Sequence, residues 1–221
     1  MRRSDDGGAV VPRALSVAAA VSIFGLSFGV LMADAGMGTG KAAAMSLLVF
    51  AGGSQFAAVS VVMAGGTQVA AVLSGLLLNV RLLPFGVSVA HLVGPGLLRR
   101  AAGSHLVLDE STALATATTD PHLGRRTFWW TGVAIYLGWN VATVLGVEVG
   151  GLVGAPEDLG VDGAFPAVFV ALLVPRLREP GARMAASVGA VVALLLVPLV
   201  PSGLPVVAAT VAAVVALRFR R

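Results

Sequence analysis

Two glycines followed by two polar side chains interrupt a long uncharged stretch, and this is the first place where a ligand could bind. Residues 50–57 read Phe-Ala-Gly-Gly-Ser-Gln-Phe-Ala, and positions 42–80 carry no charge. Adjacent glycines allow a helix to break, and a helix that begins there would point its N–H groups and its positive dipole end at a carboxylate. Alternatively, the glycines only pack helices and the polar side chains bond to nearby backbone. The residues of this candidate carboxylate site are Gly53, Ser54, Gln55 and Phe56.

A single cation follows in the same apolar region, where Asn79 and Arg81 lie midway along a predicted membrane segment. An arginine at membrane depth costs at least about 2.5 kcal/mol and generally faces a cavity or a partner. Arg81 is therefore a candidate carboxylate clamp or one half of an internal ion pair. Alternatively, the helix starts later and the side chain reaches the interface.

Asp109 and Glu110 are the only acidic residues of a mostly apolar stretch, 106–119. They could pair with Arg81, bind a ligand's ammonium group or carry a coupling proton. They could equally form the exposed first turn of a helix, where acids are favourable. Gly25 and Gly29 have the four-residue spacing that brings membrane helices close, and we expect a packing role for them.

The composition indicates the class of protein in which these residues stand. Hydrophobic residues make up 57% and charged residues 12% of the 221 positions, whereas soluble domains carry about 25% charged residues. The sequence therefore predicts an all-α, polytopic membrane helix bundle within a lipid bilayer. Basic residues lie between apolar runs and not in one patch, so no nucleic-acid partner is expected. Without cysteine, and with three scattered histidines, neither a metal site nor a cofactor is expected.

Because about 20 apolar residues cross the hydrocarbon core as a helix, we predict six to eight membrane segments, including broken or re-entrant helices. Residues 14–217 form a single transmembrane domain between cytoplasmic tails at 1–13 and 218–221. The first segment could instead be a signal peptide, although its apolar run is longer than a typical one. The segments are 14–33, 43–63, 69–93, 106–119, 127–147, 163–175 and a proline-broken hairpin within 184–217.

Arginines near the predicted helix ends place both termini in the cytoplasm, on the inner side of the cell membrane. If all eight segments cross, Arg99 and Arg100 lie outside, against the positive-inside rule. If 43–63 and 106–119 are re-entrant, six segments cross and every arginine pair lies inside. The sequence leaves both topologies open.

Two other classes of function compete with a transporter. Ser54 and His91 could form the serine–histidine pair of a rhomboid-like intramembrane protease. The nucleophile motif Gly-x-Ser-x-Gly is absent, however, because position 56 is phenylalanine. A channel or scaffold that transports nothing is the second alternative. We favour a transporter over an enzyme.

Four blocks of sequence, taken together, resemble the AzlC-type branched-chain amino acid permeases from about residue 14 onward. The most specific is Ser-x-x-x-Phe-Ala-Gly-x-x-Gln-Phe within 46–57. One departure is Leu82-Leu83 after Arg81, where many members have a histidine. The blocks are Phe24-Gly25-x-Ser27-Phe28-Gly29, residues 46–57, Leu78-Asn79-Val80-Arg81 and Asp109-Glu110-Ser111.

The resemblance implies the large subunit of a two-component exporter, paired with a small AzlD-type membrane subunit. The implied substrates are branched-chain and related amino acids such as valine, leucine and methionine. In the combined hypothesis, the carboxylate binds at residues 53–55 near Arg81 and the ammonium group faces Asp109 or Glu110, which could also carry a coupling proton. The aliphatic side chain lies among Phe28, Phe50, Phe56 and Phe85.

Overall fold

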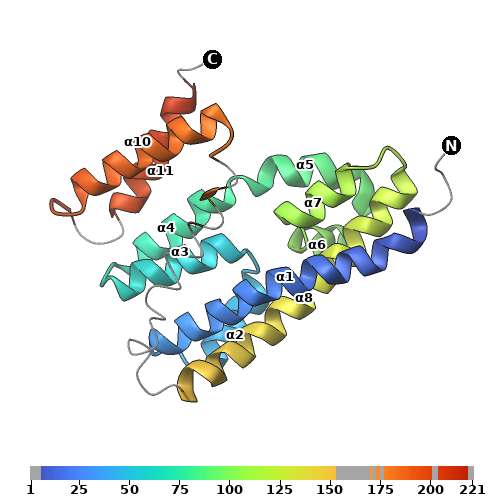
Figure 1. The fold of residues 1–221 in the computed structure, drawn as a ribbon, viewed down its shortest axis with the longest axis horizontal. Helices are drawn as coiled ribbons and strands as arrows, with labels where there is room; N and C mark the ends of the chain where they lie inside the picture. The colour runs from blue at the N-terminus through green and yellow to red at the C-terminus, as the bar shows by residue number, and fades with distance from the viewer. Residues whose placement is uncertain (1–5, 153–169, 171–172, 175–176, 201–203, 219–221) are drawn as a thin grey trace. The chain divides into compact units, whose positions relative to one another are not determined.

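The computed structural model describes residues 6–152, 170, 173–174, 177–200 and 204–218, and the described part is helical with no strand (Figure 1). This agrees with the predicted all-α class. The chain divides into two compact units, residues 1–52 with 79–152 and residues 53–78 with 153–221. The prediction of a single transmembrane domain stays a prediction.

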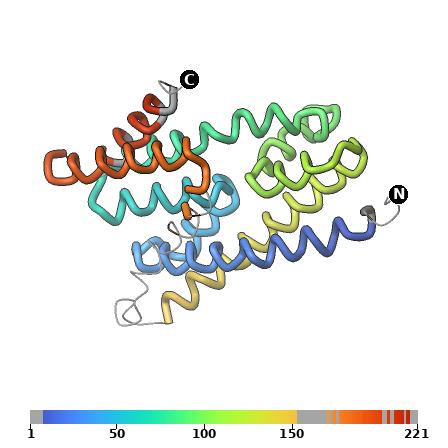
Figure 2. The backbone as a smooth tube through the Cα atoms, turned by 45° about the horizontal axis from the view of Figure 1, so that its top comes forward, coloured from blue at the N-terminus to red at the C-terminus, as the bar shows by residue number. Residues whose placement is uncertain are grey.

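The first unit is built on two long helices, α1 (Asp6–Asp34) and α8 (Pro121–Leu152), which lie side by side (Figures 1 and 2). They run parallel, because Ser22 of α1 lies against Gly138 of α8, and Ala33 lies against Gly150. At 1.5 Å per residue they are about 43 and 48 Å long, enough to cross a hydrocarbon core of about 30 Å. Both topologies considered above require this parallel arrangement.

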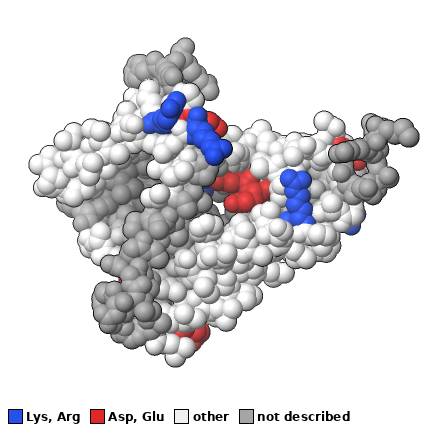
Figure 3. Space-filling model, viewed as in Figure 1, with Lys and Arg blue, Asp and Glu red and all other residues white. Residues whose placement is uncertain are grey.

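Among the described residues, α1 and α8 alone are long and apolar enough to cross a membrane singly. Helix α4 (Gln68–Asn79) with α5 (Leu82–Val93) would be a third span if that bent pair is counted as one. The total of six to eight segments stays a prediction. The expected segment 163–175 lies largely outside the described residues. On the face seen in Figure 3, charged side chains are few and most of the described surface is uncharged, as a lipid-facing surface requires.

Helix α2 (Thr39–Leu48) enters the first unit from the C-terminal end of α8 and stops near its middle. At its start, the Thr39 hydroxyl donates to Glu148 Oε1 at 2.8 Å. Near its end, Ser46 Oγ lies 3.4 Å from Thr143 Oγ1. Because the contacts move from position 148 to position 143 as α2 proceeds, α2 runs antiparallel to α8 and covers only part of its length.

Helices α6 (Leu97–His105) and α7 (Asp109–Thr116) form a hairpin that enters from the opposite end of α8. A side chain on Gly94, just before α6, would contact both Arg99 and Arg125, so this end lies beside the start of α8. The turn of the hairpin reaches deeper, because Leu106 contacts Gly132. Helix α7 then returns, since the Ala115 carbonyl lies against Gly124. Helix α6, the amphipathic first helix of this hairpin with its two arginines, was not predicted.

Helix α5 (Leu82–Val93) ends beside the start of α8, where Leu92 O accepts a hydrogen bond from Arg125 Nε at 3.1 Å. The predicted segment 69–93 is not one unbroken helix. Helix α4 (Gln68–Asn79) ends before Val80, and the pair is bent at the break. The physical reason is Pro84, which has no N–H to bond to Val80 O and is tolerated only in the first turn of a new helix.

The second unit contains two helical hairpins. Helices α3 (Gly52–Met63) and α4 are joined by a turn with Gly65 at φ 75°, and Val61 packs against Ala70 and Ala71. Helices α10 (Pro180–Leu196) and α11 (Leu204–Arg218) pack on each other, with Gly189 beside Ala209. This second pair is the hairpin that the prolines near position 200 predicted.

Candidate functional site

The helical conformation is interrupted between α2 and α3 at residues 49–51, immediately before the glycine pair. Phe50 adopts φ 37°, the only positive φ of a non-glycine residue among those described. Side chains avoid this region unless their surroundings hold them there. The predicted helix break is therefore present, and it lies two residues before the predicted start of the carboxylate site.

The predicted carboxylate-site residues occupy the first turns of α3. Ser54, Gln55 and Phe56 are buried, with Gln55 fully so, and each makes polar or ring contacts in the structure. The first N–H groups of a helix have no carbonyl partner within it and point out of its N-terminal end. The local backbone is therefore of the kind that an anion-binding helix start needs, and its role in binding stays a prediction.

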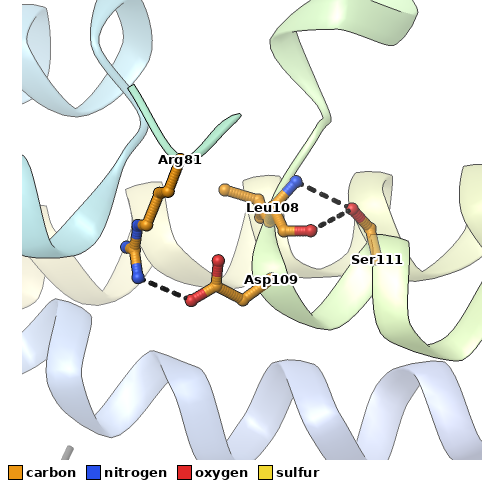
Figure 4. Close-up of polar contacts among 4 residues, drawn as sticks. All are labelled: Arg81, Leu108, Asp109 and Ser111. Atoms are coloured by element: carbon orange, nitrogen blue, oxygen red, sulfur yellow. Dashed lines mark hydrogen bonds and ion pairs between the residues drawn. The ribbon is translucent and has the colours of Figure 1, made fainter. Parts of the chain in front are cut away.

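Arg81 and Asp109, 28 residues apart, form an ion pair in the first unit (Figure 4). Arg81 Nη1 lies 2.8 Å from Asp109 Oδ2, and the two side chains are 47% and 24% exposed. Arg81 stands in the break between α4 and α5, and Asp109 is the first residue of α7. Asp109 follows Leu106 by three residues, and Leu106 contacts Gly132, the twelfth of the 32 residues of α8. The structure therefore has features of both alternatives, because a helix begins just after Arg81 and Arg81 is also one half of an ion pair.

Ser111, the third residue of the Asp-Glu-Ser block, holds the start of α7. Its buried hydroxyl accepts a hydrogen bond from Leu108 N–H at 3.0 Å (Figure 4). The same hydroxyl donates to Leu106 O at 2.7 Å. Capping of this kind stabilises a helix by about 1 kcal/mol. The serine therefore positions Asp109 and leaves the two acids as the candidates for ligand contact.

The other predicted site residues are distributed over both units. Asn79 ends α4, and its buried Oδ1 has no hydrogen-bond partner. Glu110 is half-buried beside Asp109 in α7. Gly25 and Gly29 face α8. Phe28 stacks on Trp139 with ring centroids 6.2 Å apart, whereas Phe56 belongs to the second unit, so the common aliphatic pocket stays a prediction.

Sequence reasoning assigned no role to His105 and Tyr136, which lie at the helix break. His105 Nε2 is 2.8 Å from Leu47 O, and the Tyr136 hydroxyl is 3.4 Å from the same oxygen. Each of these residues is an isolated polar group in its own segment. Only the meeting of α2, α6 and α8 makes them a cluster, so no local sequence signal could have found it.

A cleft of about 360 Å³ lies between α1, α7 and α8, near the end of the first unit where α1 and α8 begin. Its walls combine aliphatic side chains with one cation, Arg13, and several threonine hydroxyls, among them that of Thr131. Thr131 is buried, and its Oγ1 has no hydrogen-bond partner. The cleft is large enough for a small amino acid.

Two long apolar helices, two broken helical segments and a largely uncharged surface are features of an α-helical membrane protein. The chain belongs to the AzlC family, whose sequence profile, described as AzlC protein, matches residues 16–153. Membership of this family and similarity to membrane proteins make it a membrane transporter-type subunit.

Two curated relatives come from Helicobacter pylori and are both described as an uncharacterized membrane protein. The protein of strain 26695 is 25% identical over 187 residues, and the protein of strain J99 is 24% identical over 188 residues. In both cases the match covers 83% of this chain and 81% of the relative. No solved structure matches this chain.

Proposed function

We propose that this chain is the large subunit of an exporter of branched-chain and related neutral amino acids in the inner membrane. The observation that carries the proposal is the combination of AzlC membership with the Arg81–Asp109 ion pair of the first unit. Charged side chains at membrane depth mark substrate or ion pathways. A zwitterion needs a cation for its carboxylate and an anion for its ammonium group, and the pair supplies one of each.

The irregular backbone at residues 49–51 supports the same function. Non-helical backbone at membrane depth is tolerated only where protein or a water-filled cavity satisfies it. Transporters place such broken helices near the middle of the bilayer and use their half-helix ends to bind substrate and ions. In this proposal the backbone at residues 53–55 and the Arg81 side chain are the candidates for binding the carboxylate, and Asp109 and Glu110 are the candidates for binding the ammonium group. Substrate enters through the cleft that contains Arg13, and Asp109 or Glu110 carries the coupling proton.

The contacts of the first unit support the six-crossing topology over the eight-crossing one. Arg99 lies near Arg125 at the start of α8, and α1 also begins at that end. All these arginines would then lie on the cytoplasmic side, as the positive-inside rule requires. The hairpin of α6 and α7 would be re-entrant from the cytoplasm, and α2 would enter from outside.

Cysteine labelling can test this topology, because the chain has no cysteine of its own. Leu98 is 87% exposed, and a side chain at Gly38 would meet no atom within 4 Å, so each position accepts a single cysteine. With an impermeant maleimide, we expect Leu98→Cys to react only in inside-out vesicles and Gly38→Cys only in right-side-out vesicles. Reaction of Leu98→Cys from outside would restore the eight-crossing topology.

Amino acid efflux from loaded cells tests the function itself. Cells should be loaded with dipeptides of valine, leucine or methionine and should express the chain alone, with a small AzlD-type membrane protein, or neither. We expect efflux above the empty-vector rate only when both proteins are present, because we propose that the chain is one of two subunits. Efflux of every amino acid at the empty-vector rate would contradict an exporter. Labelling of Ser54 by a serine-reactive reagent would support the protease instead.

A further inference from the structure

The last turn of α2 ends in a carbonyl that two other segments of the first unit hold. The last four carbonyls of a helix have no N–H partner inside it. Leu47 O is one of these, and it accepts hydrogen bonds from His105 Nε2 at 2.8 Å and from the Tyr136 hydroxyl at 3.4 Å. Because a carbonyl only accepts, His105 carries its proton on Nε2. The stronger bond thus joins α2 to the tip of the hairpin that enters from the opposite end.

The same two side chains also hold the strained residue of the break. The Phe50 ring packs edge to face on Tyr136, with centroids 4.8 Å apart, and lies 5.8 Å from the His105 ring. His105 and Tyr136 also contact each other, at 5.6 Å. A phenylalanine at φ 37° persists only where neighbours hold it. The three aromatic rings and the Leu47 carbonyl therefore form one cluster around residues 47–50.

We propose that His105 and Tyr136 are positioning residues for the substrate site, an inference that rests on the proposed function. They fix the backbone of residues 47–50, which leads directly along the chain into Gly52 and the proposed carboxylate site at the start of α3. Tyr136 stands at the middle of α8, so the cluster lies at the depth where a transporter binds its substrate. Neither residue contacts the substrate in this account.

The test compares variants that keep or remove the hydrogen-bond donor of His105. A glutamine in its place puts an amide N–H close to where the histidine Nε2 stood, whereas a leucine has no donor. In cells that express both subunits, His105→Leu should raise the KM of valine efflux about tenfold, the factor expected for one lost hydrogen bond at a site-defining position. His105→Gln should stay within about threefold of wild type, and Tyr136→Phe should fall between the two.

A second readout reports the break directly. Val49 is half-exposed in the break, so a cysteine at this position can be alkylated. The alkylation rate of Val49→Cys should rise when His105→Leu is added, whereas the alkylation rate of Gly38→Cys should stay unchanged. Equal KM and equal alkylation in wild type, His105→Leu and Tyr136→Phe would overturn the inference. If His105→Leu does not accumulate, Tyr136→Phe decides by the same two measurements. Absence of efflux from the wild type itself would instead refute the proposed function, and the alkylation comparison would still test the cluster.

Discussion

Replacement of Gly29 by leucine is expected to prevent stable folding of the first unit. A Cβ at this position would overlap the Thr143 carbonyl oxygen and would lie 2.8 Å from both Gly146 Cα and Val147 N. All three are backbone atoms of α8, so no side-chain rotation can relieve the clash. Overpacking of a tight interface costs about 1–3 kcal/mol or more, and here α1 and α8 would have to separate along their shared length.

The same substitution at Gly8 of α1 provides a matched control, because a side chain there would meet no atom within 4 Å. Size-exclusion chromatography and thermal unfolding in detergent compare the two variants. We expect Gly8→Leu to match wild type, and Gly29→Leu to elute as aggregate or to lose most of its thermal stability. A monodisperse Gly29→Leu protein with an unchanged midpoint would show that α1 and α8 do not pack as described.

Removal of either partner of the Arg81–Asp109 pair is expected to stop transport. Each charge lies at membrane depth in this account, and a lone charge there costs about 2.5–3.5 kcal/mol. Arg81→Ala leaves the Asp109 carboxylate without its 2.8 Å partner, and Asp109→Ala does the same to the guanidinium. Both single variants should therefore lower valine efflux by at least about tenfold.

The neutral double variant separates a binding role from a structural one. Arg81→Gln with Asp109→Asn leaves no unpaired charge, so the protein should accumulate as wild type does. It should still fail to export valine, because neither group of the zwitterion finds its counter-charge. Recovery of efflux in the double variant would mean that the pair only supports the fold. Arg126→Gln with Asp120→Asn removes one charge of each sign from exposed positions and should leave efflux unchanged.

The helix break before α3 could be predicted from sequence, whereas the break at Arg81 could not be placed correctly. The glycine pair at 52–53 is a local signal, and the chain breaks within three residues of it. Near Arg81, a continuous apolar pattern predicted one membrane segment through Arg81 and Pro84, although Pro84 lacks the N–H that an unbroken helix needs. At that position the missing N–H of proline therefore outweighs the hydropathy of its neighbours.

The partners within the site are a matter of tertiary structure. Opposite charges made an Arg81 contact with Asp109 or Glu110 one of several possibilities, but only the fold of α7 brings Asp109 to 2.8 Å. Helix α6 escaped prediction because Arg99 and Arg100 lower its hydropathy and its nine residues are too few for a span. His105 and Tyr136 meet Leu47 only because segments from opposite ends of α8 converge.

Counterflow of labelled valine into proteoliposomes that contain both subunits tests the central claim most directly, because it asks whether the site recognises a zwitterion. We expect saturable uptake of labelled valine, and we expect unlabelled valine and leucine to reduce it by competition. Valine amide, which lacks the carboxylate, should leave the uptake unchanged at the same concentration. Unsaturable uptake, or equal competition by valine and its amide, would contradict a carboxylate site at the broken helix.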